Sequence, residues 1–173
     1  MSNQVIVLLL GGFDPPTNDV RHACTSLLNR PEVKSVWLCP IDPISPAKHV
    51  VDLCNVFCQQ YYLETNNKIT CCTAAIDKNM SKDQLVEWAR INYPNEDFRL
   101  ADFSPFFTDR KPVYRIFFAG EGISSGRDVA VKITQAFSVS KNITSRIKSG
   151  RDESRNMFRV VWEYIQKHKL YRS

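Results

Sequence analysis

Residues 5–18 read VIVLLLGGFDPPTN. The first six are all apolar, and a short run of this composition is typical of a strand buried on both faces of a parallel sheet. Two glycines end the run, and Asn18 or Asp19 can cap a helix that extends to about Asn29. Glycine lets the backbone approach a ligand, and helix N-terminal amides point at anions. We therefore expect a phosphate-binding turn at residues 11–18.

The rest of the chain alternates predicted strands with predicted helices. Strands are expected over 33–39, 68–76, 98–102 and 114–119, with a short sixth over 137–139, and helices over 47–65, 82–93, 141–148 and 154–168. This alternation implies βαβ crossovers. The expected fold is a single α/β domain over residues 1–173. It would be a doubly wound, Rossmann-like, mostly parallel sheet of five to six strands with helices on both faces and a C-terminal helical tail from about residue 141. The least regular segment, 103–112, is expected to be a loop.

Composition narrows the class of protein. The 173 residues are 43% hydrophobic and 24% charged, which is ordinary for one globular domain. The apolar run at 5–10 is too short for a signal peptide, and no stretch approaches the roughly 18 apolar residues of a membrane span. A cytoplasmic protein without a membrane partner is expected. Homo-oligomerisation stays open.

Cysteine and charge patterns give weaker signals. Six cysteines are scattered through apolar segments, which indicates free buried thiols, and no set of four Cys or His ligands suggests a metal site. The net charge is +5, and residues 139–173 carry nine Lys or Arg against three acidic residues. An anionic ligand or a solvated helix face would both explain this tail. Nucleic acid is not an expected partner, because no aromatic-rich strand motif accompanies the basic residues.

The turn itself excludes two common nucleotide motifs and matches a third. Neither GxxxxGK[ST] nor GxGxxG is present. The string GGFDPPTN instead resembles G-x-F-[DN]-P-x-[HT]-x-x-H, the first signature of the nucleotidyltransferase superfamily, and its Thr-Asn pair is similar to the version in nicotinamide mononucleotide adenylyltransferases. The resemblance implies that the nucleotide-binding turn comprises Gly11, Gly12, Phe13, Asp14 and Thr17. In the family, two such positions, a His or Thr and then a His, stabilise the ATP phosphates while the second substrate's phosphate attacks the α-phosphorus and pyrophosphate leaves.

The second of those positions falls on Val20, which can neither donate a hydrogen bond nor carry charge. His22 is the nearest imidazole, but two residues along a helix correspond to about 200° of rotation. His22 therefore reaches the phosphates only through a local shift of register, and a catalytic role and a surface role both stay open. Asp14 is likewise either a nucleotide ligand or a turn residue that binds backbone amides.

The family's second signature, I-S-S-T-x-x-R, has two competing positions. Residues 123–127 read ISSGR, whereas the tail at 146–150 (RIKSG) and 161–171 (VWEYIQKHKLY) is similar to the family's closing pattern and places the signature on 138–144. We prefer the tail register because it rests on the longer match. It keeps Ser140, puts Lys141 in place of threonine and puts Thr144 in place of arginine. Lys141 would then be a catalytic cation that partly compensates for the lost arginine, or a solvent-facing charge.

Two further residues follow from the resemblance. Asp102 ends an LAD string where the family has G-[AS]-D in contact with the adenosine, and Lys48 lies where many members carry a substrate-binding lysine. The implied reaction is adenylyl transfer from ATP, accompanied by Mg²⁺ that no motif of the chain ligates, to nicotinamide or nicotinate mononucleotide. The products would be NAD, or its deamido form, and pyrophosphate.

Two alternatives stay open beside this reaction. One is a degenerate relative that binds a nucleotide or a partner without catalysis, because Val20 and Thr144 replace charged groups. The other is a cytidylyltransferase-type enzyme acting on a phospho-alcohol, which the Thr-Asn version of the turn disfavours, since those members usually carry His-x-Gly-His.

Overall fold

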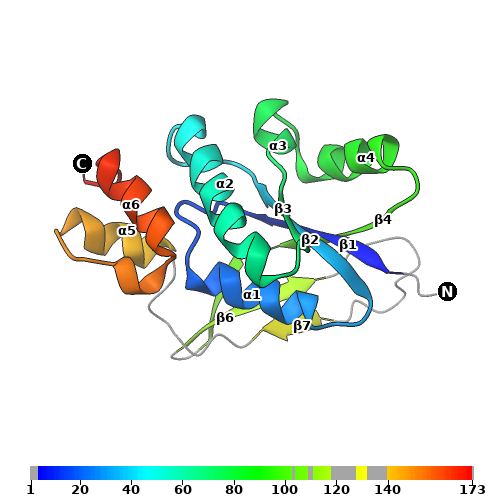
Figure 1. The fold of residues 1–173 in the computed structure, drawn as a ribbon, viewed down its shortest axis with the longest axis horizontal. Helices are drawn as coiled ribbons and strands as arrows, with labels where there is room; N and C mark the ends of the chain where they lie inside the picture. Colours follow the sequence, from blue (N-terminus) through cyan, green and yellow to red (C-terminus); the bar gives the residue numbers. More distant parts are fainter. Residues whose placement is uncertain (1–3, 103, 109–110, 118–127, 132–139, 173) are drawn as a thin grey trace.

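A computed structural model describes residues 4–102, 104–108, 111–117, 128–131 and 140–172. Four strands form one parallel sheet in the order β3-β2-β1-β4 (Figure 1): β1 (Val5–Gly11), β2 (Val33–Pro40), β3 (Ile69–Cys71) and β4 (Asp97–Asp102). The apolar run of residues 5–10 is the central strand β1, as predicted. The chain moves outward on one side of β1 to β2 and β3, and then returns to the other side for β4.

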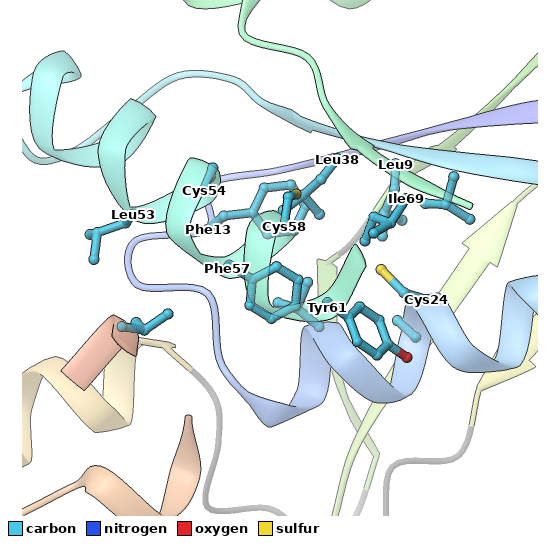
Figure 2. Close-up of a cluster of buried hydrophobic side chains, with 14 of the residues drawn as sticks. Leu9, Phe13, Cys24, Leu38, Leu53, Cys54, Phe57, Cys58, Tyr61 and Ile69 are labelled. Atoms are coloured by element: carbon cyan, nitrogen blue, oxygen red, sulfur yellow. The ribbon is translucent and has the colours of Figure 1, made fainter. Parts of the chain in front are cut away.

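Helices cover both faces of this sheet, as Figure 1 shows. They are α1 (Asn18–Leu28), α2 (Ala47–Glu64), α3 (Ala74–Asp77) and α4 (Lys82–Asn92). Successive side chains of a strand point to opposite faces, so β1 supplies two cores. Val5, Val7 and Leu9 pack with α1 and α2, whereas Ile6, Leu8 and Leu10 pack with α3 and α4. Figure 2 shows the first core, where Phe57 and Cys58 of α2 meet Leu38 of β2.

The helix starts follow local capping chemistry. Ser81 caps α4 in a full capping box: its side chain accepts from the Gln84 amide, and the Gln84 side chain accepts from the Ser81 amide. The cap of α1 is Thr17 rather than Asn18 or Asp19, because Thr17 has extended backbone angles and the helix already includes Asn18.

Three predicted elements need correction. The expected strand over 68–76 ends at Cys71, because Ala74 and Ala75 lie in the short helix α3 and alanine favours helix over strand. The expected loop at 103–112 contains β5 (Ser104–Thr108). The expected strand at 114–119 is β6 (Lys111–Phe117), which pairs antiparallel with β5 and with β7 (Asp128–Val131) rather than joining the parallel sheet.

Within the described residues the parallel sheet therefore has four strands rather than five to six. The predicted strand at 137–139 lies outside those residues. The α/β class, the parallel sheet and the two helical faces are as expected from sequence.

The C-terminal tail is helical, as predicted. It contains α5 (Ser140–Lys148), a 3-10 turn (Ser154–Asn156) and α6 (Arg159–Lys167). Gly150, at φ +85°, ends the first helix where a side chain would be strained. Val161 and Ile165 of α6 join the core formed with α2. None of the helices in the described part of the chain has the length and apolarity needed to cross a membrane.

Candidate functional site

The carboxyl end of β1 lies between the ends of two other strands. Gly11 is in register with Pro40 of β2, and Leu10 is in register with Asp102 of β4. The backbone of Asp102 therefore lies beside the turn. Strand order reverses between β2 and β4 around β1, and open α/β sheets bind ligands in the crevice at such a switch point.

In the first half of the turn, Gly12 and Phe13 have different environments. The Phe13 side chain is 3% exposed and belongs to the core beneath the turn, and its backbone adopts φ +46°. Gly12 is exposed, and a Cβ built on it would meet no atom within 4 Å. Phe13 thus anchors the turn, whereas the space in front of Gly12 is open to a ligand.

Asp14 ties the turn to two distant segments. Its Oδ2 accepts a hydrogen bond of 2.8 Å from the Ser45 amide, and its Oδ1 accepts one from the Tyr171 hydroxyl. The Asp14 side chain is buried, and the Asp14–Pro15 peptide is cis. Burial and then the Asp14 charge raise the pKa of Tyr171 well above its ordinary value. Both carboxylate oxygens therefore already bind protein donors, and Asp14 holds the turn against the 41–46 loop and the C-terminal tail.

Thr17 lies where the turn becomes helix. It is 1% exposed, and its carbonyl accepts from the amides of Val20 at 3.0 Å and Arg21 at 3.3 Å. The side chain of the next residue, Asn18, donates to the Arg155 carbonyl at 2.9 Å, which links the start of α1 to the tail. Like the turn, this helix start is therefore fixed by segments far away in the sequence.

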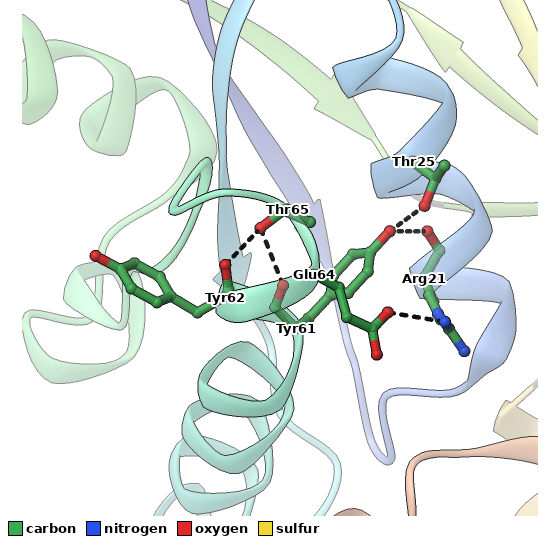
Figure 3. A network of polar contacts seen from close by, with 6 residues as sticks. All are labelled: Arg21, Thr25, Tyr61, Tyr62, Glu64 and Thr65. Carbon is green, nitrogen blue, oxygen red and sulfur yellow. Dashed lines mark hydrogen bonds and ion pairs between the residues drawn. The ribbon is translucent and has the colours of Figure 1, made fainter.

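The residues of α1 that follow Thr17 do not place an imidazole at the turn. Val20 is fully buried in the core, and His22 is exposed on another face of α1, as helical rotation predicts. The neighbouring cation, Arg21, is bound elsewhere (Figure 3). Its guanidinium binds Glu64 at 2.8 Å and lies 5.1 Å from the Phe158 ring centroid. The Tyr61 hydroxyl donates to the Arg21 carbonyl, which fixes this side of α1 against α2.

In the preferred register, positions 140–144 of the expected second signature fall in helix α5. Ser140 and Lys141 begin the helix. Thr144 is half-buried beside the fully buried Ile143. Arg146, two residues beyond the position where the family has its arginine, binds the buried Glu153. The competing position at 123–127 lies outside the described residues.

Lys48 is exposed in the first turn of α2. Next to it is a polar network that sequence reasoning missed. The Tyr164 hydroxyl donates to Asp52 at 2.9 Å and lies 3.0 Å from His49 Nδ1. The His168 ring is tilted against the Tyr164 ring, with 4.2 Å between their centroids. The tail pattern contained Tyr164, His168 and Tyr171, but nothing in the sequence placed them against α2 and the turn.

Among the solved structures similar to this chain are three described as adenylyltransferases. A protein from Vibrio parahaemolyticus described as a nicotinate-nucleotide adenylyltransferase is 17% identical with a TM-score of 0.69, covering 98% of this chain and 96% of that one. Two structures of Plasmodium falciparum nicotinic acid mononucleotide adenylyltransferase, complexed with NaAD and with APC, are 13% and 14% identical with TM-scores of 0.66 and 0.65. Each match covers 97% of both chains.

No family model matches the chain, and no curated protein matches it by sequence. At these identities the likeness shows the fold alone. The chain has the fold of nicotinate-nucleotide adenylyltransferases over almost its whole length.

Proposed function

We propose that this protein is a cytoplasmic nucleotidyltransferase that transfers the adenylyl group of ATP to nicotinamide or nicotinate mononucleotide and releases pyrophosphate. The observation that carries the proposal is the turn after β1. It has an open approach at Gly12, an anchored Asp14 and a helix start at Thr17, and it lies at the switch point of a sheet with the adenylyltransferase fold.

The residues of the turn would bind the triphosphate. The backbone at Gly11 and Gly12, together with Thr17, would hold the ATP phosphates, and Ser140 and Lys141 would close on them from the start of α5. Asp102 would contact the adenosine and Lys48 the mononucleotide. The phosphate of the mononucleotide then attacks the α-phosphorus in line, and no covalent enzyme intermediate forms. Catalysis of this kind depends on positioning and on stabilising charge.

Mg²⁺ would enter with ATP. No three His, Cys, Asp or Glu side chains of the described residues converge as a metal site. The phosphate oxygens fit the preference of Mg²⁺ for oxygen ligands, so we propose that the triphosphate holds the ion. The ion would neutralise part of the charge that Val20 and Thr144 cannot.

The direct test is turnover. The purified chain is incubated with ATP, Mg²⁺ and either mononucleotide, and the dinucleotide and pyrophosphate are quantified by chromatography. Cytidine triphosphate with a phospho-alcohol serves as the comparison reaction. Product from nicotinamide or nicotinate mononucleotide is expected, and the absence of product from every nucleotide acceptor would refute the proposal.

A second candidate is a nucleotide-binding relative without catalysis. The burial of Val20 favours it, because the position that carries the family's second imidazole is part of the core. This candidate predicts that ATP or a dinucleotide raises the melting temperature while turnover is absent. Turnover at ordinary enzyme rates eliminates it, so the two candidates are separated by measuring binding and product formation on the same preparation.

A further inference from the structure

Five of the six cysteines gather around the edge of the sheet formed by β2 and β3. Cys71 and Cys72 are adjacent in sequence, but they face opposite sides of the sheet: Cys71 packs on the core that contains Cys54 and Cys58, whereas Cys72 lies in the other core with Cys39. All are free thiols. The candidate nucleotide site uses none of them.

A groove runs between α2 and β3 beside this cluster. Its volume is about 560 Å³, and its walls are mostly apolar. It is lined by residues of both elements, among them Cys58 and Cys71, and by Tyr62 and Leu63, which are 44% and 79% exposed. The two thiols therefore open onto the same solvent-accessible hollow from opposite walls.

The two thiols are neighbours in this groove. The Cys71 side chain, as a hydrogen-bond partner, and then burial raise the pKa of the Cys58 thiol. Cys58 is 6% exposed, whereas Cys71 is half-buried and is the more accessible thiol of the pair. We propose that Cys58 and Cys71 form an oxidisable dithiol, a modification site that closes into a disulfide joining α2 to the edge strand.

The other thiol pair is the natural competitor. The neighbouring Cys39 side chain, as a hydrogen-bond partner, lowers the pKa of Cys72 to about 7. Acidity favours Cys72, but reactivity also requires access. Cys39 is fully buried and Cys72 is 8% exposed, whereas Cys71 lines the groove. Access therefore assigns the reaction to Cys58 and Cys71.

The oxidant would be a peroxide. The Cys71 thiolate attacks one peroxide oxygen, an S–O bond forms, the O–O bond breaks, and hydroxide leaves as water after taking up a proton. The Cys58 sulfur then attacks the sulfenic sulfur of Cys71. An S–S bond forms, the S–O bond breaks, and the second water leaves with the Cys58 proton. Two thiols and one hydrogen peroxide thus give one disulfide and two waters.

Peptide mapping tests the proposal directly. The folded chain is treated with hydrogen peroxide, denatured, alkylated and digested with trypsin, which places Cys54 and Cys58 on peptide 49–68, Cys71 and Cys72 on 69–78, and Cys39 on 35–48. We expect loss of the separate peptides 49–68 and 69–78 and gain of their cross-linked form. A link between 35–48 and 69–78, or sulfinic acid or an unreacted thiol at Cys71 without a link, overturns the proposal.

Matched variants assign the sulfurs. Cys58→Ser and Cys71→Ser should each abolish the link, whereas Cys54→Ser, one helical turn away on α2, should keep it. Persistence of the link in Cys58→Ser would contradict the assignment. A measurement without oxidation guards against misfolded variants: phenylarsine oxide, which binds two neighbouring thiols, should protect Cys58 and Cys71 of the wild-type chain from alkylation. Alkylation of both thiols in its presence would also overturn the proposal.

Discussion

The turn at residues 11–17 and the helical positions that should support it differ in how they are built. The turn is fixed by hydrogen bonds from the Ser45 amide and the Tyr171 hydroxyl to Asp14. Position 20 of α1 is a core valine, and α5 has a half-buried threonine at position 144. The backbone shape expected of a phosphate-binding turn is thus present, whereas the two positions for which the resemblance implies charged side chains hold valine and threonine.

This difference separates binding from catalysis. A phosphate cradle made of backbone groups depends on the shape of the chain, which Asp14 and Phe13 maintain from inside the protein. Acceleration of adenylyl transfer depends on charge placed at the reacting phosphorus, and loss of one such group can cost orders of magnitude in rate. Evolution of the two properties can therefore proceed independently within one fold.

The largest effect is expected from breaking the anchor of the turn. Asp14→Asn replaces one acceptor oxygen by an NH₂ group that faces a donor, and we expect the free energy of unfolding to fall by about 3 kcal/mol. Urea denaturation at neutral pH measures it. Glu87→Gln, which removes a carboxylate from an exposed position of α4, is the control and should change stability by less than about 0.5 kcal/mol. Equal effects of the two variants would show that the turn is not held through Asp14.

Position 20 gives the next largest effect. Val20→His places an imidazole in a fully buried position, and we expect a loss of about 2 kcal/mol of stability from overpacking and desolvation. His22→Ala, two residues away on the exposed face, should change stability by less than about 0.5 kcal/mol. Thermal melts of both variants make the comparison.

The same variant bears on the degenerate candidate. If the protein has lost catalysis through positions 20 and 144, turnover should appear when Val20→His and Thr144→Arg are combined, provided that the imidazole turns from the core toward the phosphates. If the Val20→His variant is as stable as wild type, its imidazole points to the expected phosphate side of the helix rather than into the core.

The sequence predicted those parts of the fold that rest on local pattern. The six apolar residues of β1 and the helices predicted over 82–93 and 141–148 all depend on near neighbours. The antiparallel sheet of β5, β6 and β7 was missed although Thr108 of β5 pairs with Lys111 of β6, close by in sequence, because an irregular composition over 103–112 hid the first strand.

The candidate site shows the same limit. The spacing of residues in the sequence predicts the Gly-Gly turn and the burial of position 20 on one helical face. The hydrogen bond between Tyr171 and Asp14 joins residues 157 positions apart, and only the folded chain brings them together. The sequence left Asp14 as either a nucleotide ligand or a turn residue. The hydrogen-bond partners of both its carboxylate oxygens favour the role of a turn residue.

Tyr171→Phe tests the tail's part in holding the turn. Removal of one donor to a carboxylate should cost about 1.5 kcal/mol of stability at neutral pH. Burial and the Asp14 charge raise the pKa of Tyr171 above its ordinary value of 10.0, so the unfolded chain ionises first. The contribution of the hydroxyl is therefore complete below about pH 10 and declines as the pH rises further.

Wild type should have a higher free energy of unfolding than Tyr171→Phe, and urea denaturation should show that this difference decreases above about pH 10. Tyr62→Phe, at a 44% exposed tyrosine of α2, is the matched control and should show no such narrowing. A constant difference between wild type and Tyr171→Phe from neutral to alkaline pH would mean that the hydroxyl is not held by Asp14.

The smallest change adds one methyl group at Gly12, and it distinguishes ATP binding at the turn from the stability of the fold. At Gly12 a Cβ meets no protein atom within 4 Å and φ lies outside the left-handed range, so Gly12→Ala should stabilise the chain by about 0.5 kcal/mol. If phosphates approach this backbone, the same methyl should weaken ATP binding about tenfold, or about 1.4 kcal/mol. Gly150→Ala is the opposite case: at φ +85° it should destabilise by about 1 kcal/mol and leave ATP affinity unchanged. Calorimetric titration with ATP and thermal melts of both variants give the two numbers for each glycine. Unaltered ATP affinity in Gly12→Ala would show that the ATP phosphates do not bind at the turn, whatever the stability of the variant.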